Sequence, residues 1–414
     1  MSDHVPFDLV TKILLRLPVA AILRWRGVCK RWQALIDSTE FSKLQLNHSS
    51  STTKNAFLFV LEDDGCGNGD LHFARYINGL RRETIPSFRS NPSPPAQIGV
   101  ITLIGSCNGL VCFSNDADMA IITNPATQQT HVTPAIPNPL MDLVSIADCV
   151  YRYGCGFVYD SVSDDYKVIK LHQMLMLGFD ANGEDFHSEL VIYGVRSNSS
   201  VSVKFPYFLS AEKMGVFVAG AIHWVVHDDR DRGDLVVGFD LGLGECKEIP
   251  QPEYRNRKSL KIRIGELENC LCIFANYPGR GVDVWMMKEY GVRESWSIMR
   301  SIPHPGLCYD KRIRPLGYSM TGQEILLQLD EKRLVWCDLK KNPPGVDAST
   351  EITVNGLKKK KKKNKNKKKY IDAIVCFGSL VSPGGMLPPK EQVKFDKQRK
   401  KRDGFLSAGF KLKL

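Results

Sequence analysis

The sequence lacks a long hydrophobic run. No part of its 414 residues approaches the roughly 18 consecutive apolar residues that a membrane-spanning helix needs. A signal peptide is missing too, because Lys12, Arg16 and Arg24 interrupt what would be its apolar core. We therefore expect an intracellular protein with no membrane among its partners, and we expect its twelve cysteines to be reduced thiols.

The sequence also has little that indicates catalysis or cofactor binding. Its cysteines lack the paired C-x2-C spacing of a zinc site, and it has no glycine-rich phosphate loop. Cys107 stands in a G-x-nucleophile-x-G pattern, but Asn108-Gly109 beside it favours a hairpin turn between strands. His223 lies in an apolar, strand-like run, which is typical of a packed side chain. We therefore expect no catalytic residue, no metal and no cofactor.

The excess positive charge comes from one short run. The chain has 56 basic and 45 acidic side chains, a difference of +11, and residues 358–369 supply ten lysines, which leaves +1 for the rest. The rest of the chain is therefore close to neutral and does not predict a general surface for nucleic acid. The lysine run predicts a solvated loop, and the functional alternative is a nuclear-import or nucleic-acid-binding patch.

The first 46 residues are unusually apolar and have helical spacing. The residues that recur at this spacing are Leu9, Val10, Ile13, Leu14 and Leu17. Pro18 ends the first helix, and two further short helices are expected over 19–26 and 29–37. Three short helices hide only a small core, so the surplus apolar surface indicates docking of another protein. A helical cap packed on the later part of this chain is the alternative.

The order of residues in this stretch closely resembles an F-box. The matching residues are Val5-Pro6, Ile13-Leu14, Leu17-Pro18, Leu23, Trp25-Arg26, Val28-Cys29-Lys30, Trp32, Ile36 and Phe41. An F-box is a three-helix module that binds a Skp-type adaptor, which docks on a cullin to form an SCF ubiquitin ligase. The resemblance implies an adaptor-binding surface formed by Pro6, Leu14, Leu17, Pro18, Trp25, Val28 and Trp32.

Beyond a polar segment at 47–56, which predicts a linker, the pattern changes to short β-type runs. They extend from Phe57 to about Ile352 and are separated by turn residues such as Asn108-Gly109, which predicts an all-β fold. A weak internal repeat places Gly220, Asn269 and Gly322 at corresponding turns, 49 and 53 residues apart. This spacing is near the roughly 50-residue kelch period and favours a β-propeller. A β-sandwich or an irregular β-barrel is the alternative.

The β-rich region resembles the plant F-box-associated domain. The residues that carry this resemblance are Gly105–Leu110, Asn124–Thr127, Gly156–Asp160, Ser163–Lys167, Val216-Phe217, Gly220, His223-Trp224, Phe239–Leu241, Val284–Met286, Tyr290-Gly291 and Glu294–Trp296. The resemblance implies a kelch-like propeller that recruits a substrate. We therefore predict an F-box at 1–46, a linker at 47–56, a propeller-like domain at 57–383 interrupted by the lysine run, and a basic tail at 384–414.

The two resemblances together imply a substrate-recognition subunit of an SCF-type ubiquitin ligase. The F-box would dock on the adaptor, and the β domain would hold a target protein for ubiquitination and proteasomal degradation. The chain itself would contribute no reacting group. Two alternatives stay open: a propeller that binds proteins without driving degradation, and a nucleic-acid-associated protein acting through residues 358–369. We expect the protein in the cytoplasm and nucleus.

Overall fold

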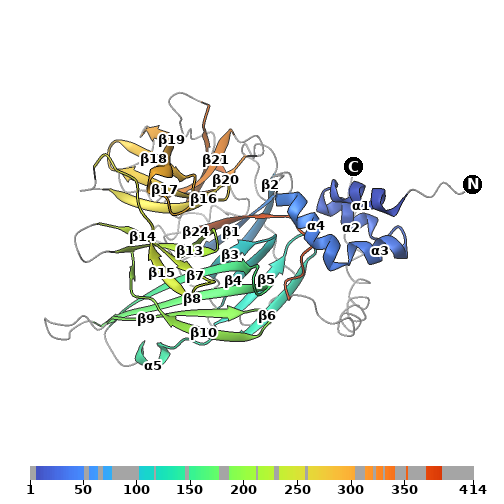
Figure 1. Ribbon diagram of the computed structural model, residues 1–414, viewed down its shortest axis with the longest axis horizontal. Helices are drawn as coiled ribbons and strands as arrows, with labels where there is room; N and C mark the ends of the chain where they lie inside the picture. Colours follow the sequence, from blue (N-terminus) through green and yellow to red (C-terminus); the bar gives the residue numbers. More distant parts are fainter. Residues whose placement is uncertain are drawn as a thin grey trace, which may run out of the picture.

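A cluster of helices lies beside a ring of β-sheets in the computed structural model of this chain (Figure 1). The structure describes residues 6–50, 56–63, 69–76, 102–115, 118–144, 149–176, 186–210, 213–227, 233–256, 260–303, 313–319, 323–329, 332–340, 351–352 and 370–384. The lysine run at 358–369 and the predicted basic tail after residue 384 lie outside these ranges. No helix within the ranges is long and apolar enough to cross a membrane.

Four helices occupy residues 6–50, where the sequence predicted three. They are α1 (Phe7–Leu15), α2 (Val19–Trp25), α3 (Lys30–Ile36) and α4 (Thr39–Ser50). The first two begin directly after Pro6 and Pro18, whose fixed φ and missing N–H suit the start of a helix. Their shared core is small and consists of Val10, Leu14, Ile22, Ile36 and Phe41.

The fourth helix corrects the predicted linker. A linker was expected over 47–56, but α4 continues to Ser50 and the first strand starts at Ala56. The Ser38 hydroxyl accepts the N–H of Phe41 at 3.1 Å and so caps the start of α4. Phe41 and Gln45 lie one turn apart and are both buried, which fixes this helix against the others. Once the helix is nucleated, each further residue adds a hydrogen bond, so the polar residues that follow remain helical.

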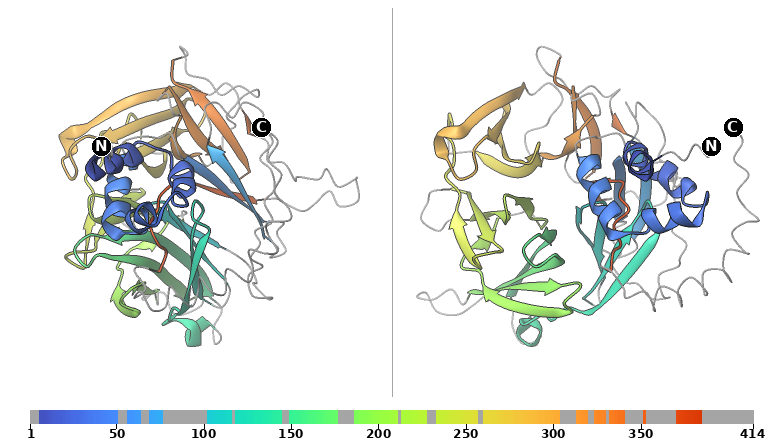
Figure 2. Two further views of the ribbon diagram at one scale, coloured as in Figure 1. Left: turned by 90° about the vertical axis from the view of Figure 1, so that its right-hand side faces the viewer. Right: turned by 45° about the vertical axis from the view of Figure 1, so that its right-hand side comes forward.

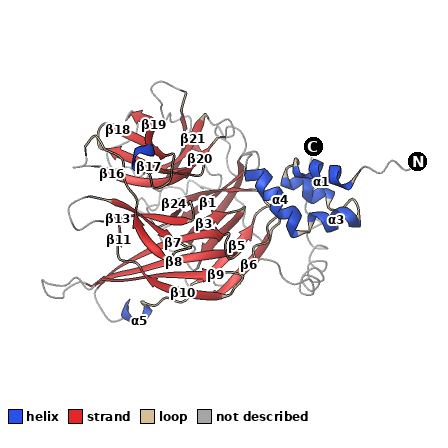
Figure 3. Ribbon diagram, in the orientation of Figure 1, coloured by secondary structure: helices blue, strands red, loops and turns tan. Residues whose placement is uncertain are grey.

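The β part consists of antiparallel sheets (Figure 3). Five sheets of four or five strands follow one another along the chain. The first consists of β3 (Thr102–Cys107), β4 (Leu110–Ser114), β5 (Met119–Asn124) and β6 (Gln129–Ala135), and the second of β7 (Cys149–Asp160), β8 (Asp165–Met176), β9 (Phe186–Gly194) and β10 (Ser199–Lys204). The third consists of β11 (Phe208–Leu209), β12 (Val216–Val218), β13 (Ala221–His227), β14 (Leu235–Asp240) and β15 (Glu245–Glu248), the fourth of β16 (Lys261–Leu267), β17 (Cys270–Tyr277), β18 (Gly281–Met287) and β19 (Trp296–Pro303), and the fifth of β20 (Ile313–Tyr318), β21 (Glu324–Leu329), β22 (Arg333–Asp338) and β23 (Glu351–Ile352). A short helix α5 (Met141–Val144) precedes β7, and a 3-10 turn η2 (Arg293–Ser295) precedes β19.

A sixth sheet closes the ring. It has three strands in the order β2-β1-β24 and pairs β1 (Ala56–Asp63) with both β2 (Gly69–Tyr76) and β24 (Tyr370–Phe377). The end of the domain is thereby hydrogen-bonded to its beginning. β24 also contacts β3 on one side and β20 on the other, and Figure 2 shows the sheets arranged around a centre. The predicted propeller is therefore confirmed, and the sandwich and barrel alternatives are wrong.

The motifs of the β part have structural tasks. The Asn108-Gly109 turn has φ values of 51° and 81°, the left-handed backbone that a tight hairpin needs. Asp165, in the Asp-Asp turn, accepts the backbone N–H groups of Arg196 and Ser197 at 2.7 and 3.2 Å and so joins two hairpins of one blade. Such contacts stabilise the turns at the corners of the blades, so these motifs do not identify a ligand.

The helices are fixed to the propeller through α4 and the segment after β24. Leu380 packs against the helical core, and Lys43 Nζ lies 3.3 Å from a carboxylate oxygen of Asp164 in the β7–β8 turn. In Figure 1, α1, α2 and α3 lie on the side of α4 that faces away from the sheets. The helical part therefore contacts the propeller on the side of α4, and α1, α2 and α3 lie on the opposite side.

Candidate functional site

The helical part exposes large apolar side chains although its core is complete. On α1, Leu9 and Ile13 lie one turn apart and are 48% and 51% exposed. At the end of α2, Trp25 is 40% exposed and Val28 is 64% exposed. These four residues, which we call the exposed apolar set, are neighbours of fully buried residues such as Leu14. Exposed apolar surface of this kind is a mark of a protein-binding site.

The turn between α2 and α3 is stiff. The rings of Trp25 and Trp32 stack with centroids 5.2 Å apart and planes 11° apart. Arg26, at the end of α2, donates two hydrogen bonds to the carboxylate of Asp37, at the end of α3, at 2.6 and 2.7 Å. A fork-to-fork pair of this type holds both partners in one geometry. The exposed face of Trp25 is therefore ordered before any partner binds, which lowers the entropy cost of binding.

The structure divides the predicted adaptor-binding residues. Pro6, Pro18, Trp25 and Val28 lie at the surface, while Leu17 and Trp32 are half-buried against the helical core. Leu14 is a correction, because its side chain is 0% exposed and belongs to that core. Their roles in binding stay predictions.

Sequence reasoning missed two residues of the exposed apolar set. The sequence places neither Leu9 nor Ile13 on the predicted adaptor-binding surface. They precede Val10 and Leu14 by one position each and are therefore turned by about 100° from the buried side. This spacing was the available signal, but it does not say whether Leu9 and Ile13 or Val10 and Leu14 form the buried side of the helix.

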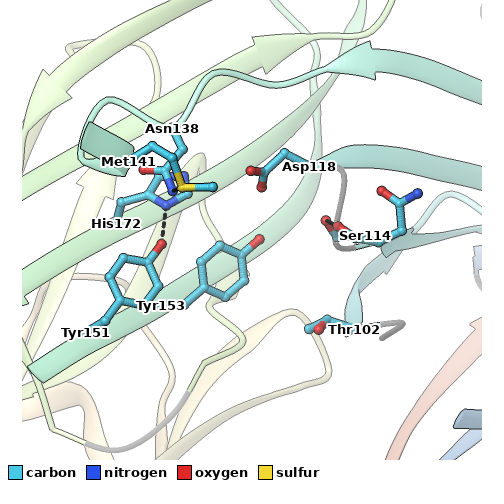
Figure 4. Close-up of a pocket in the computed structure, with 9 residues that line it drawn as sticks. Thr102, Ser114, Asp118, Asn138, Met141, Tyr151, Tyr153 and His172 are labelled. Carbon is cyan, nitrogen blue, oxygen red and sulfur yellow. Dashed lines mark hydrogen bonds between the residues drawn. The ribbon is translucent and has the colours of Figure 1, made fainter. Parts of the chain in front are cut away.

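A pocket lies in the propeller, and Figure 4 shows the side chains that line it. It is a cavity of about 320 Å³ between the first two large sheets. The lining residues are Thr102, Ser114, Asn115, Asp118, Asn138, Met141, Tyr151, Tyr153 and His172. Tyr153 is seven residues before Asp160 on β7, and about 3.3 Å per residue puts it roughly 23 Å from the turn that contacts α4.

Three groups in this pocket have shifted pKa values: His172, Tyr151 and Tyr153, and burial raises the pKa of Tyr153 well above its usual range. Burial lowers the pKa of His172 to about 4, so its imidazole is neutral at pH 7. Burial, together with the nearby Asp118 carboxylate, raises the pKa of Tyr151 to about 12. Asp118 Oδ1 is itself 2.7 Å from Nζ of Lys170, whose side chain is 0% exposed. The charge of Asp118 in the pocket wall is therefore compensated.

The other candidate chemical groups are packed residues. Burial raises the pKa of the Cys107 thiol to about 12, the opposite of what a thiolate nucleophile needs. His223 accepts or donates hydrogen bonds at both ring nitrogens, to the Val216 carbonyl at 2.9 Å and the Tyr290 hydroxyl at 2.7 Å. Burial lowers the pKa of His223 to about 4. Within the described ranges, no group of three or more His, Cys, Asp or Glu side chains has the arrangement of a metal site.

Comparison with known proteins accounts for both parts of the chain. The family model of the F-box domain matches residues 3–44, and that of the F-box associated beta propeller domain matches residues 83–383. This chain belongs to the plant F-box proteins with an associated propeller. F-box proteins are in general adaptors for substrates and not catalysts, in agreement with the packed state of Cys107 and His223.

Relatives of this F-box protein extend over nearly its whole length. F-box protein CPR1 of Arabidopsis thaliana is 31% identical over 436 residues, which span 99% of each chain. An F-box/kelch-repeat protein of the same plant, At3g23880, is 29% identical over 350 residues, covering 79% of this chain and 86% of its own. Both relatives are named as F-box proteins, and the second name adds kelch repeats.

Proposed function

We propose that this F-box protein is the substrate-recognition subunit of an SCF-type ubiquitin ligase. The observation that supports it best is the exposed apolar set on α1 and at the end of α2, helices that lie on the side of α4 away from the sheets. In F-box proteins this module binds a Skp-type adaptor, which in turn docks on a cullin. The propeller, fixed to α4, is then free to hold a target protein.

The proposed mechanism uses position and not a reacting group. Burying the exposed apolar set in an interface of about 1,600 Å² would suffice for a stable contact with the adaptor. Leu380 and the Lys43–Asp164 ion pair join the helices to the propeller, so a target on the propeller stays at a fixed place relative to the adaptor. The effective concentration of target lysines near the ubiquitin-loaded conjugating enzyme rises accordingly. Ubiquitination and proteasomal degradation of the target follow, and the chain itself is non-catalytic.

The first test is co-purification of the full chain with a Skp-type adaptor and a cullin. Val28→Asp places a charge in a contact that excludes water, so we expect adaptor binding to fall at least about tenfold. Val201→Asp is the matched control, because Val201 is 62% exposed on the edge strand β10 while Val28 is 64% exposed. Unchanged binding of the Val28→Asp protein would remove this surface from the proposal.

A second experiment separates degradation from simple binding. Proteins that co-purify with the full chain are followed in plant cells with and without inhibition of the cullin. Accumulation of a bound protein under inhibition supports the ligase function, and unchanged levels favour the non-degradative alternative. The proposed location in the cytoplasm and nucleus is tested by imaging a fluorescent fusion, beside a variant whose lysines at 358–369 are replaced by glutamine.

A further inference from the structure

The pocket between the first two large sheets contains two buried polar atoms without a partner. Within the described part of the chain, neither the Tyr153 hydroxyl nor Nε2 of His172 has a hydrogen-bond partner, although both atoms are shielded from solvent. An unsatisfied buried polar atom costs about 1–3 kcal/mol, so a group that bonds to it is favoured. Tyr153 and His172 face each other in the β7–β8 register, with ring centroids 5.6 Å apart.

The hydrogen bonds around His172 decide what its free nitrogen offers. Asn138 accepts the N–H of Leu140 with its side-chain oxygen at 3.1 Å, which leaves its amide NH2 for the Tyr151 oxygen. The Tyr151 hydroxyl then donates to Nδ1 of His172 at 2.5 Å, as the dashed line in Figure 4 marks. Since the imidazole is neutral, its hydrogen sits on Nε2. The two donors without a partner in the pocket wall are thus the N–H of His172 and the O–H of Tyr153.

An acceptor lies opposite these donors. Asp118 has a left-handed backbone, with φ of 56°, in the turn before β5, and its carboxylate lies over Lys170. Lys170 Nζ also donates to the backbone oxygen of Asp118 at 2.9 Å, so both partners are held in place. In Figure 4, Asp118 stands across the pocket from His172. The Lys170 ammonium balances the Asp118 charge, and the two tyrosines and the histidine are neutral at pH 7.

We propose that this pocket binds a carboxamide, the side chain of an asparagine or glutamine in a target protein. The carbonyl oxygen of a carboxamide accepts from His172 Nε2–H and the Tyr153 hydroxyl, and its NH2 donates toward the Asp118 carboxylate. A carboxylate ligand would face Asp118 with a like charge, and an ammonium ligand would leave both donors unmatched. The exposed side chains of Met141 and Tyr151 beside the pocket offer apolar contact for residues next to the amide.

The ligand's origin in a target protein rests on the proposed receptor function, whereas the preference of the pocket for a carboxamide does not. The test uses the full chain labelled with ¹³C at its methionine methyl groups. Met141 in the pocket is the reporter, assigned through Met141→Leu, and Met286, buried in another blade, is the internal control. The probes are propionamide, propionate, n-propylammonium and N-methylacetamide, which have similar sizes.

Propionamide is expected to shift the Met141 signal with saturation in the millimolar range, as suits a ligand of its size. Propionate and n-propylammonium are expected to bind at least about fivefold more weakly, and the Met286 signal stays in place. Equal binding of all four probes, tighter binding of a charged one, or no shift with any probe overturns the proposal. Tighter binding of N-methylacetamide than of propionamide overturns the side-chain assignment, because the pocket would then prefer a main-chain peptide group.

Tyr153→Phe is the decisive variant, since it removes a hydroxyl that has no partner in the described part of the chain and so preserves folding. We expect it to weaken propionamide binding at least about fivefold. Tyr290→Phe is the control, because the Tyr290 ring also contacts the ring of a histidine, His223, but in another sheet. Adaptor co-purification of the Tyr153→Phe protein reports separately on the receptor function, so failure of either hypothesis is recognised on its own.

Discussion

The helical part and the propeller place their tryptophan side chains differently. Trp25, in the helices, is 40% exposed, whereas Trp224, in the propeller, is 0% exposed and packs edge-on against Phe205. The helical core has five buried members, while each pair of neighbouring large sheets shares a core of about a dozen. A module of about 45 residues that also exposes Trp25 buries little apolar surface, so we expect most of the stability of the chain to come from the propeller.

The feature that marks the candidate site of the propeller is polar. The polar atoms without partners that mark the pocket, on Tyr153 and His172, belong to the propeller. The feature that marks the candidate site of the helices is the exposed apolar set. Each region therefore departs from ideal packing in the way that its proposed partner would correct, an apolar adaptor surface for the helices and a hydrogen-bonding group for the pocket.

The largest expected effect separates core from surface within the helices. Leu14→Ala removes a wholly buried side chain from a five-residue core, so we expect a loss of about 3 kcal/mol in the stability of the helical part. Leu9→Ala, at a side chain that is 48% exposed, is expected to change this stability by less than about 1 kcal/mol while weakening adaptor binding. Hydrogen exchange of residues 7–50 measures the stability change of each variant, with amides of β8 as the reference. Equal effects of the two substitutions would contradict the assignment of Leu14 to the core.

The second prediction concerns the pH dependence of the propeller. His223 has an ordinary pKa of 6.5 that burial lowers to about 4 in the folded protein. Between these values the unfolded chain binds more protons than the folded one, so stability falls as the pH falls from 6.5 to 4. The shift corresponds to about 3 kcal/mol.

The measurement for this prediction is urea unfolding of the propeller at pH 7, 5.5 and 4. His223→Gln is the variant, since it removes the titrating group and keeps a polar side chain next to Tyr290. We expect a smaller loss of stability on acidification for His223→Gln than for the natural chain. The same pH slope in both proteins would show that other groups control acid unfolding.

Local turn chemistry made much of the propeller predictable. Asn108-Gly109 and the alternating runs on either side predicted the hairpin of β3 and β4, and the structure has both. The pairing of β1 with β24 had no such signal, because it joins residues about 300 positions apart. The helix α4 was missed because Thr39–Ser50 is mostly polar, so its pattern resembles a loop until Phe41 is seen to pack against α1 and α3.

The candidate sites were harder to predict than the fold. Leu9 and Leu14 look alike in sequence, and only the packing of the helices decides that one is exposed and the other buried. In the pocket, Asp118 comes from a turn and Tyr153 and His172 from two strands, and none of them belongs to a motif. Their meeting depends on how two sheets pack, which the order of residues along the chain does not express.

The smallest expected effect lies at the joint between the two regions. The Lys43–Asp164 ion pair is exposed, and Asp164 also accepts hydrogen bonds from Tyr159 and Arg196, so the carboxylate keeps partners when Lys43 is removed. We expect Lys43→Ala to lower stability by less than about 1 kcal/mol, and this small effect to vanish at high salt. Leu380→Ala, which removes apolar contact with the helical core, is expected to cost about 1–2 kcal/mol. Urea unfolding and hydrogen exchange of α4 compare the two variants. A larger loss for Lys43→Ala than for Leu380→Ala would mean that charge, and not apolar packing, fixes the helices to the propeller.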